Sequence, residues 1–198
     1  VLFDTGLGAA AREQGGGRLL DGLAAAGYSP EQVSIVVLTH MHGDHIGGLM
    51  ENGAPAFKNA RYVAGQAEYD FWSDKAREGS PAEGGHKAVL ANVVPLAEKT
   101  TFIGDNATVV PGITSMLAAG HSPGHMIFRV ESGDKQLILT ADTANHFVLS
   151  LQRPDWEVRY DMDKDAAAAT RKKVFDMIAT DRLGFLGYHM PFPAVGFV

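Results

Sequence analysis

The chain of 198 residues is 45% hydrophobic and 20% charged, a composition typical of a globular domain that can bury a substantial core. Its 17 basic and 23 acidic residues give a net charge of −6 without a stripe of Lys and Arg, so we do not expect a nucleic-acid-binding surface. The absence of cysteine excludes disulfides and cysteine-bound metals, and no apolar run is long enough to predict a membrane span. A single domain over residues 1–198 is therefore expected.

Both ends of the sequence resemble the interior of a longer protein. The chain opens on VLFDTG without an initiator Met, and it closes on AVGFV without a polar tail. We expect an N-terminal segment to be missing. The localisation therefore stays open, and a bacterial periplasmic or secreted location fits if a signal has been removed.

The first half of the sequence predicts alternating helices and strands. Apolar residues recur at helical spacing before Gly27, and a β-branched run follows. In chain order the expected elements are a helix at 12–26, a buried strand at 35–38, a strand at 61–64, a helix at 66–72 and a helix at 87–96. Residues 73–86 read as a polar connection in which His86 is exposed.

The second half predicts a strand-rich segment followed by one long helix. Gly133 and Asp134 form the turn pair of a hairpin. The expected elements are short strands within 108–117, hairpin strands at 127–130 and 136–140, a helix at 166–179 and a strand at 183–187. In the long helix, Val174, Phe175 and Ile178 are expected on the buried face, and Arg171, Lys172 and Lys173 in solvent.

Four metal-binding side chains follow the buried strand at 35–38. His40, His42, Asp44 and His45 lie within six residues, and imidazole and carboxylate groups suit zinc and similar divalent ions. The spacing differs from the helical HExxH motif and predicts a strand-to-helix loop. Asp44 could cap a helix that starts near His45, and the Gly47–Gly48 pair would allow close backbone approach. The alternative is a solvated polar loop with incidental histidines.

These residues resemble a known family. HMHGDH matches HxHxDH, the signature of the metallo-β-lactamase-fold hydrolases, and GHSPGH at 120–125, TAD at 140–142 and His189 resemble its later ligand positions. THMHGDHIGGLM, EYDFW and GYHM followed by PFPAVG are most similar to the methyl parathion hydrolase branch. The resemblance covers the whole chain. It implies an α/β fold, the metallo-β-lactamase-like αββα sandwich, with two mixed β-sheets flanked by helices.

The resemblance also implies a centre with two divalent ions. One ion would be held by His40, His42 and His121, the other by Asp44, His45 and His189, and Asp142 would bridge them. Zinc is the default, although such ligands also accept manganese, iron and cobalt. The resemblance places Asp4 beneath the ligands as a steadying group, with a simple turn carboxylate as the alternative. His125 would serve loop packing or hydrogen bonding rather than bind metal.

The implied chemistry is hydrolysis by a hydroxide that bridges the two ions. Asp142 and Asp44 are the expected catalytic carboxylates, and either Asp44 or the second metal ion would assist the leaving group. Phosphotriester hydrolysis is the close-family implication, and lactone or aryl-ester hydrolysis is the alternative. The sequence departs from the acyl-homoserine lactonases, which carry a Tyr shortly after the bridging Asp, because Thr143, Ala144 and Asn145 stand there.

The expected partner is a small molecule with an apolar or aryl group. Its pocket would be formed by Phe71, Trp72, His146, Phe147, Met190 and Phe192. We expect neither nucleic acid nor membrane as a partner, and a homodimer stays open. Other function classes are a non-catalytic metal-binding protein, a nucleic-acid processing enzyme and a di-iron electron carrier, which an absorption spectrum would reveal.

Overall fold

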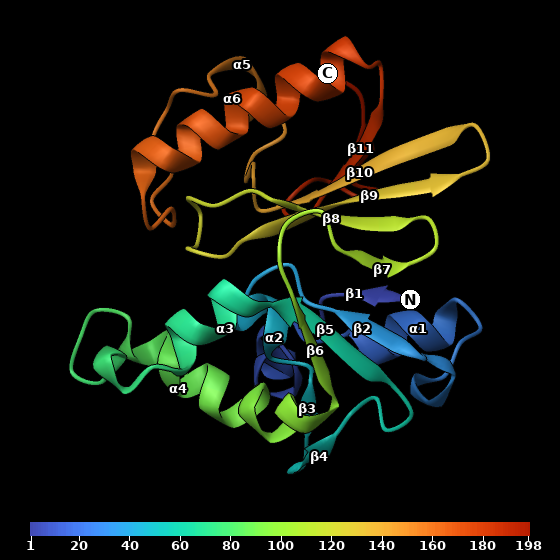
Figure 1. Cartoon of the computed structure of the whole chain (residues 1–198). Coiled ribbons are helices and arrows are strands. Elements are labelled where there is room, and N and C mark those ends of the chain that lie inside the picture. The colour runs from blue at the N-terminus through green and yellow to red at the C-terminus, as the bar shows by residue number, and fades with distance from the viewer. The chain divides into compact units, whose positions relative to one another are not determined.

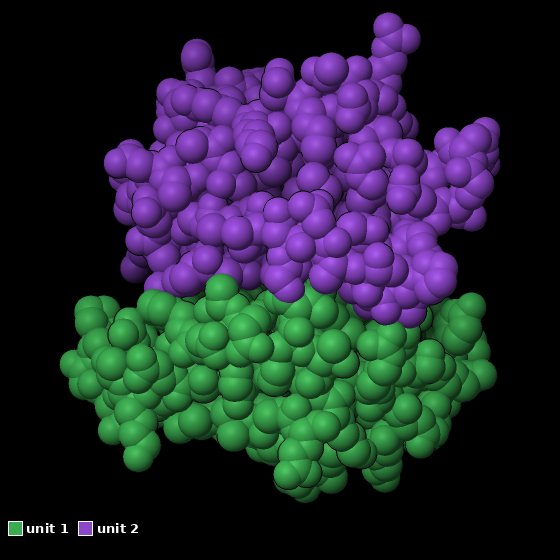
Figure 2. All heavy atoms as spheres, in the orientation of Figure 1, with its two compact units in different colours: residues 1–103 green, residues 104–198 purple.

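The structure is a computed structural model that describes all 198 residues. It divides into two compact units, residues 1–103 and residues 104–198, which are coloured separately in Figure 2. Each unit contains its own sheet and its own cluster of buried apolar side chains. The expected single domain over residues 1–198 stays a prediction.

The first unit is built on a four-stranded sheet with the order β1-β2-β5-β6, in which all neighbouring strands are parallel (Figure 1). A small antiparallel pair, β3 and β4, lies apart from it. The strands are β1 (Leu2–Phe3), β2 (Ile35–Val37), β3 (Met50–Glu51), β4 (Ala54–Pro55), β5 (Arg61–Gly65) and β6 (Thr100–Ile103). The α-helices are α1 (Leu19–Ala25), α2 (Gly43–Ile46), α3 (Gln66–Ser73) and α4 (Glu83–Asn92), with 3-10 helices η1 (Ala9–Gln14), η2 (Pro30–Gln32), η3 (Lys75–Arg77) and η4 (Val94–Lys99).

Burial explains the parallel sheet of the first unit. All three residues of β2 are buried, as is typical of parallel strands that are covered on both faces. Apolar residues of α3, α4 and η4, among them Trp72, Val89 and Leu96, form the core with β2 and β5. The predicted strands at 35–38 and 61–64 and the helix at 66–72 are confirmed within one residue at their ends.

The second unit is built on a six-stranded sheet with the order β12-β11-β10-β9-β8-β7. It is mixed, because β10 and β11 are parallel and the other neighbours are antiparallel. The elements are β7 (Thr108–Val110), β8 (Ile113–Leu117), β9 (Met126–Ser132), β10 (Lys135–Ala141), α5 (Leu149–Gln152), α6 (Lys164–Thr180), β11 (Gly184–Gly187) and β12 (Val195–Gly196). The sheets were both expected to be mixed, whereas that of the first unit is parallel.

Helix α6 covers the sheet of the second unit (Figure 1). Its start is fixed by Asp163, whose carboxylate accepts a hydrogen bond from the Ala166 N–H. Its apolar face packs Val174, Phe175 and Ile178 against strands that include β10 and β11. These three residues therefore occupy the buried face that the sequence predicts.

Four expectations about single helices and residues are wrong. The helix at 12–26 is divided into η1 and α1, because Gly15 and Gly17 adopt positive φ angles of 86° and 63°. Helix α4 starts at Glu83 within the predicted connection and ends before 96, and His86 is 1% exposed rather than solvated. Arg171, expected in solvent, is also 1% exposed.

None of the helices combines the length and the hydropathy that a membrane-spanning helix requires.

Candidate metal centre

The loop between β2 and α2 gathers the ligands of the first unit. His40 Nε2 lies 3.0 Å from His42 Nδ1, and His45 Nε2 lies 3.6 Å from Asp44 Oδ2. The rings of His40 and His45 are 4.0 Å apart. Asp44 stands in the first turn of α2, which His42 precedes, so the expected Asp44 cap is wrong. The structure thus brings these four side chains together as the sequence predicts.

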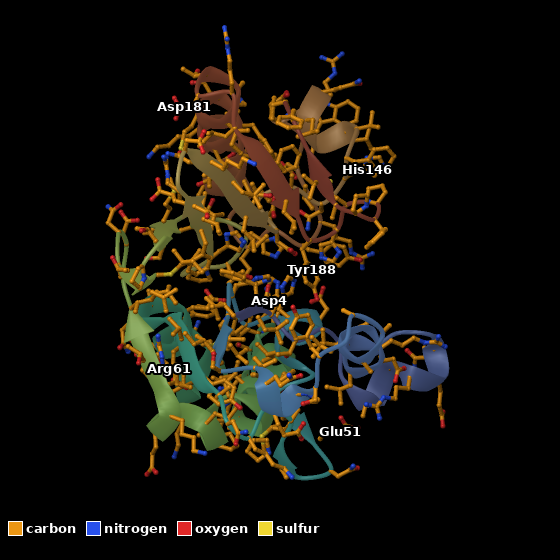
Figure 3. The ribbon with its side chains drawn as sticks, turned by 90° about the vertical axis from the view of Figure 1, so that its right-hand side faces the viewer. Asp4, Glu51, Arg61, His146, Asp181 and Tyr188 are labelled. Carbon is orange, nitrogen blue, oxygen red and sulfur yellow. The ribbon has the colours of Figure 1, made fainter.

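Asp4 holds this loop from the end of β1. Its carboxylate accepts hydrogen bonds from the Thr39 N–H at 2.8 Å and the Thr39 hydroxyl at 2.7 Å, and its Oδ2 lies 2.8 Å from His45 Nδ1. Because an ionised carboxylate only accepts, His45 Nδ1 carries the proton and Nε2 keeps its lone pair. Figure 3 labels Asp4 and Arg61, which lie at opposite ends of the parallel strands. Asp4 therefore has the contacts of a steadying group rather than of a simple turn.

Two glycines let helix α2 pack against the chain that follows β1. A Cβ atom at Gly47 would stand 2.4 Å from the Leu7 carbonyl oxygen, and one at Gly48 would stand 2.2 Å from that of Thr5. Such distances are below any real contact. The close backbone approach expected at these glycines is therefore present.

Glu68 is a residue of this centre that the sequence analysis did not single out. It is buried on α3, where its Oε1 accepts the Met41 N–H at 3.0 Å and the Trp72 Nε1–H at 2.7 Å. Met41 stands between His40 and His42, so Glu68 fixes the backbone that carries both rings. No pattern in the sequence distinguishes it from the exposed acidic residues of a helix.

In the second unit, three expected ligands lie together at strand ends. His121 Nε2 is 3.3 Å and His189 Nε2 is 3.0 Å from Asp142 Oδ2. Asp142 follows β10 and His189 follows β11 by two residues; because these strands are parallel neighbours, their carboxyl ends lie side by side. Figure 3 labels Tyr188 at this end of β11 and Asp181 near the other.

The backbone before Asp142 is strained in a way that places the carboxylate. Ala141 has φ 45°, a conformation that is uncommon for residues other than glycine and that recurs at functional sites. The register between β10 and β11 also shifts between Leu139 and Ala141. The Asn145 side-chain amide donates to Asp142 Oδ2 at 3.2 Å.

His125 has no ring nitrogen left for a metal. Its Nε2 accepts the Asp142 N–H at 3.2 Å, and its Nδ1 lies 3.0 Å from the Ala118 carbonyl oxygen, to which it donates. The ring therefore joins the two strand ends next to Asp142, which agrees with the expected hydrogen-bonding role.

Two further residues support His121. Asp161 Oδ1 lies 2.9 Å from His121 Nδ1, and Asp161 Oδ2 lies 2.7 Å from Arg171 Nη2. All three side chains are buried. Sequence analysis missed Asp161, since it stands 40 residues from its histidine in a segment without a motif.

Within the second unit, the residues expected to form a substrate pocket line more than one cavity. Phe147 and Met190 line one cavity of about 260 Å³, whereas His146 lines another of about 290 Å³. The His146 Nδ1 accepts the N–H groups of Val148 and Leu149 at the start of α5, so this ring acts as a helix cap.

The other three aromatic residues differ in exposure. Phe192 is 98% exposed. In the first unit, Trp72 belongs to the core at 4% exposure, with its ring 5.7 Å from that of His42, and Phe71 is covered by the Arg77 guanidinium. The expectation that these six residues form one substrate pocket stays a prediction.

The chemistry and spacing of the donors fit divalent metal ions. Two donor atoms bound to a tetrahedral zinc ion at about 2.0–2.1 Å stand roughly 3.3 Å apart. The separations of 3.0 Å within the His40–His42 pair and of 3.3 Å and 3.0 Å around Asp142 are close to that value. In His45 and His121, Nδ1 is held by a carboxylate, which is the usual arrangement of metal-binding imidazoles.

Comparison with known proteins identifies the family. Residues 1–177 match the model of the metallo-beta-lactamase superfamily. The chain belongs to this superfamily. The predicted metallo-β-lactamase fold, with sheets flanked by helices, is thereby confirmed.

Relatives within the metallo-β-lactamase superfamily include lactonases. The chain is 31% identical over 129 residues to an N-acyl homoserine lactonase of Bacillus cereus, a match that covers 65% of this chain and 45% of the relative. The structure of AidC, a dizinc quorum-quenching lactonase in complex with a product, matches with a TM-score of 0.88 and 30% identity over 98% of this chain and 70% of AidC. The hydrolase AbOPH matches with a TM-score of 0.86 and 29% identity, over 98% of this chain and 69% of AbOPH.

These relatives also concern the expected branch of the superfamily and the expected substrate class. The chain spans about half the length of the curated relatives it matches. The expected superfamily is confirmed, but the lactonases among the relatives favour the lactone alternative over the methyl parathion hydrolase branch. Two divalent ions, with zinc as the default, agree with the donor sets and with the dizinc relative.

Proposed function

We propose that this chain carries the metal centre of a hydrolase that opens the ring of N-acyl homoserine lactones. The proposal is supported by relatives named as lactonases and by the donor sets of the two units. The observation that carries it is the group formed by His121, Asp142 and His189, because it supplies a carboxylate oxygen within reach of two imidazoles.

The proposed ligand set is the one expected from the sequence. Two zinc ions would be held by imidazoles and carboxylates, with Asp142 shared between them. The set consists of His40, His42, Asp44, His45, His121, Asp142 and His189. When bound, such ions lower the pKa of water toward neutrality and polarise a carbonyl oxygen.

The residues of the chain have separate tasks in this scheme. Asp4 and Asp161 hold Nδ1 protons, and so they direct the Nε2 lone pairs of His45 and His121 away from themselves. When water adds to the lactone carbonyl carbon, the ring C–O bond breaks and its oxygen needs a proton. The Asp44 side chain is 34% exposed, and we assign it the transfer of that proton to the leaving oxygen.

A side-by-side kinetic comparison tests the proposed substrate class. Zinc-loaded protein is assayed with an N-acyl homoserine lactone and with an aryl dialkyl phosphotriester, and kcat/KM is determined for each. We expect the lactone to be favoured and the Asp142→Ala variant to lose activity on both substrates. A preference for the phosphotriester would contradict the proposal and restore the methyl parathion hydrolase expectation.

A further inference from the structure

Arg171 is a buried cation in the middle of α6. It is 1% exposed, and burial of a charge is costly unless hydrogen bonds compensate for the lost water. Its guanidinium donates to three backbone carbonyls, those of Thr143 at 2.9 Å, Pro154 at 2.9 Å and Trp156 at 3.1 Å. The fourth bond goes to the carboxylate of Asp161 at 2.7 Å. Arg171 therefore joins three segments of the second unit.

Two of these contacts lead directly to expected metal ligands. Asp161 uses one oxygen for Arg171 and the other for His121 Nδ1, at 2.9 Å. Thr143, whose carbonyl Arg171 also binds, is the residue after Asp142. One guanidinium thus fixes both the ring of His121 and the chain next to Asp142, whose atoms Nε2 and Oδ2 are 3.3 Å apart.

The backbone around Asp161 reinforces this connection. The Met162 N–H donates to the His121 carbonyl at 3.2 Å, and the Asp163 N–H donates to the Gly120 carbonyl at 2.9 Å. A Cβ atom at Gly120 would lie 2.3 Å from the Ala167 N, so the loop that carries His121 lies directly against the start of α6. The Asp161 carboxylate is consequently held at a fixed place relative to the imidazole.

We propose that Arg171 and Asp161 are positioning residues that set the orientation and the proton position of the His121 imidazole for metal binding. The inference rests on the proposed two-metal function. The Asp161 carboxylate accepts at Nδ1 and so leaves Nε2 for the metal, and the hydrogen bond from Arg171 keeps that carboxylate directed at the ring. The same guanidinium holds the backbone next to Asp142, so it sets the separation of the two ligands.

The test uses the whole chain and four variants. Asp161→Asn removes the charge but leaves the three carbonyl bonds of Arg171 in place, Arg171→Met removes the guanidinium, and Arg171→Lys keeps only its charge. Lys172→Met is the matched control, since Lys172 is the exposed neighbour on the same helix. Zinc affinity is measured by competition with a chelator, the Co²⁺-substituted proteins give absorption spectra, and melting of the metal-free proteins reports folding.

We expect Asp161→Asn and Arg171→Met to lower the affinity for zinc about 10- to 100-fold and to change the Co²⁺ spectrum. Arg171→Lys should recover part of the affinity, and Lys172→Met should match the wild type. The double variant Asp161→Asn/Arg171→Met should bind zinc no more weakly than the weaker single variant, because both residues act through one imidazole.

Wild-type zinc affinity and an unchanged spectrum in Asp161→Asn would overturn the inference, even if Arg171→Met melted at a lower temperature. That result would assign Arg171 a purely structural role. Zinc binding and lactone hydrolysis are measured separately, so the two proposals can fail separately. A wild-type protein that binds zinc but opens no lactone would overturn the proposed function. The inference about Arg171 and Asp161 would then still be decided by the zinc affinities of the variants.

Discussion

The expected ligand histidines are ordered by the atoms behind them. His45 and His121 each face a buried carboxylate through Nδ1, and His40 Nδ1 lies 3.1 Å from the Thr39 hydroxyl, which donates to Asp4. Asp4 thus supports two rings of the first unit. Because the orientation and the tautomer of each ring depend on these acceptors, metal affinity should be sensitive to residues that never touch the metal.

Asp4→Asn should lower the affinity for zinc by about 10- to 100-fold, since the amide cannot accept at both of its positions. Chelator competition measures this change. Asp21→Asn, which alters an exposed acid in the first turn of α1, is the control and should bind zinc as the wild type does. Equal affinities in both variants would show that Asp4 is only a turn carboxylate.

Tyr62 gives a prediction about pH. Burial raises the pKa of the Tyr62 phenol above its ordinary value, and its hydroxyl donates to the Phe57 carbonyl at 2.9 Å. The folded state therefore holds this proton at a pH at which the unfolded chain releases it, and stability should fall as the pH rises above about 10.

Tyr62→Phe should remove this part of the alkaline loss and destabilise the protein by about 1 kcal/mol at neutral pH, because the Phe57 carbonyl loses its donor. Urea denaturation across the pH range measures both effects. Tyr28→Phe, at a residue 59% exposed, should change neither. An alkaline loss of the same size in Tyr62→Phe as in the wild type would exclude Tyr62 as its source.

Among single residues, the sequence predicts the expected metal ligands better than the residues that form hydrogen bonds to them. His40 to His45 are contiguous, and their donor types alone indicate a metal. Arg171 looks like its exposed neighbours Lys172 and Lys173, and only partners 10 to 28 residues away make its burial tolerable. The burial of His86 is not evident from the sequence for the same reason, because its Nδ1 lies 2.7 Å from the carbonyl of the distant residue Trp72.

The strands position the expected ligands, because these residues follow the carboxyl ends of strands. The parallel pairing of β10 and β11 is continued by the Tyr188 N–H, which donates to the Ala141 carbonyl at 3.3 Å. Asp142 and His189 are brought together by this pairing, although 47 residues separate them in the sequence. In the first unit, α2 must approach the chain after β1 closely to keep His45 on Asp4.

Gly48→Ala should test that close approach. Its Cβ would stand 2.2 Å from the Thr5 carbonyl oxygen, so the backbone must move, at a cost of about 1–3 kcal/mol in the free energy of unfolding. Gly22→Ala, in α1 with open space around it, should instead stabilise the protein by about 0.5–1 kcal/mol. Thermal or urea denaturation of both variants measures these changes. An unchanged free energy of unfolding in Gly48→Ala would mean that the close contact is not required.

Element prediction succeeded where local chemistry and the fold agree. The hairpin of β9 and β10 surrounds the expected Gly133–Asp134 turn, and α6 has both good helix formers and an apolar face. The start of α4 was missed because Gly84 and Gly85 are poor helix formers. The structure gives the reason for one of them: a Cβ at Gly85 would stand 2.3 Å from the Trp72 ring.

For the molecule as a whole, the superfamily match explains why ligands spread over 150 residues could be expected from one short motif. HxHxDH identifies the fold, and the fold supplies the later strand ends. It does not identify the substrate, because the same centre serves different electrophiles and the residues that select among them follow no motif. We therefore keep as a prediction the substrate pocket expected from Phe71, Trp72, His146, Phe147, Met190 and Phe192.

Metal removal should lower the stability of the entire chain. In the proposed centre, zinc would bind only the folded state, and a concentration 100 times the Kd should add about 2.7 kcal/mol to the free energy of unfolding. Melting curves with a chelator and with restored zinc measure the shift. Magnesium serves as the control ion and should restore little, because it prefers oxygen ligands.

The most direct test of the two-metal centre is the zinc content of the folded chain after reconstitution and removal of free metal. Elemental analysis should find two zinc ions in the wild type and fewer in Asp142→Ala, because we propose that both ions would share that carboxylate. Two zinc ions in a folded Asp142→Ala variant, or none in the wild type, would contradict the centre proposed here.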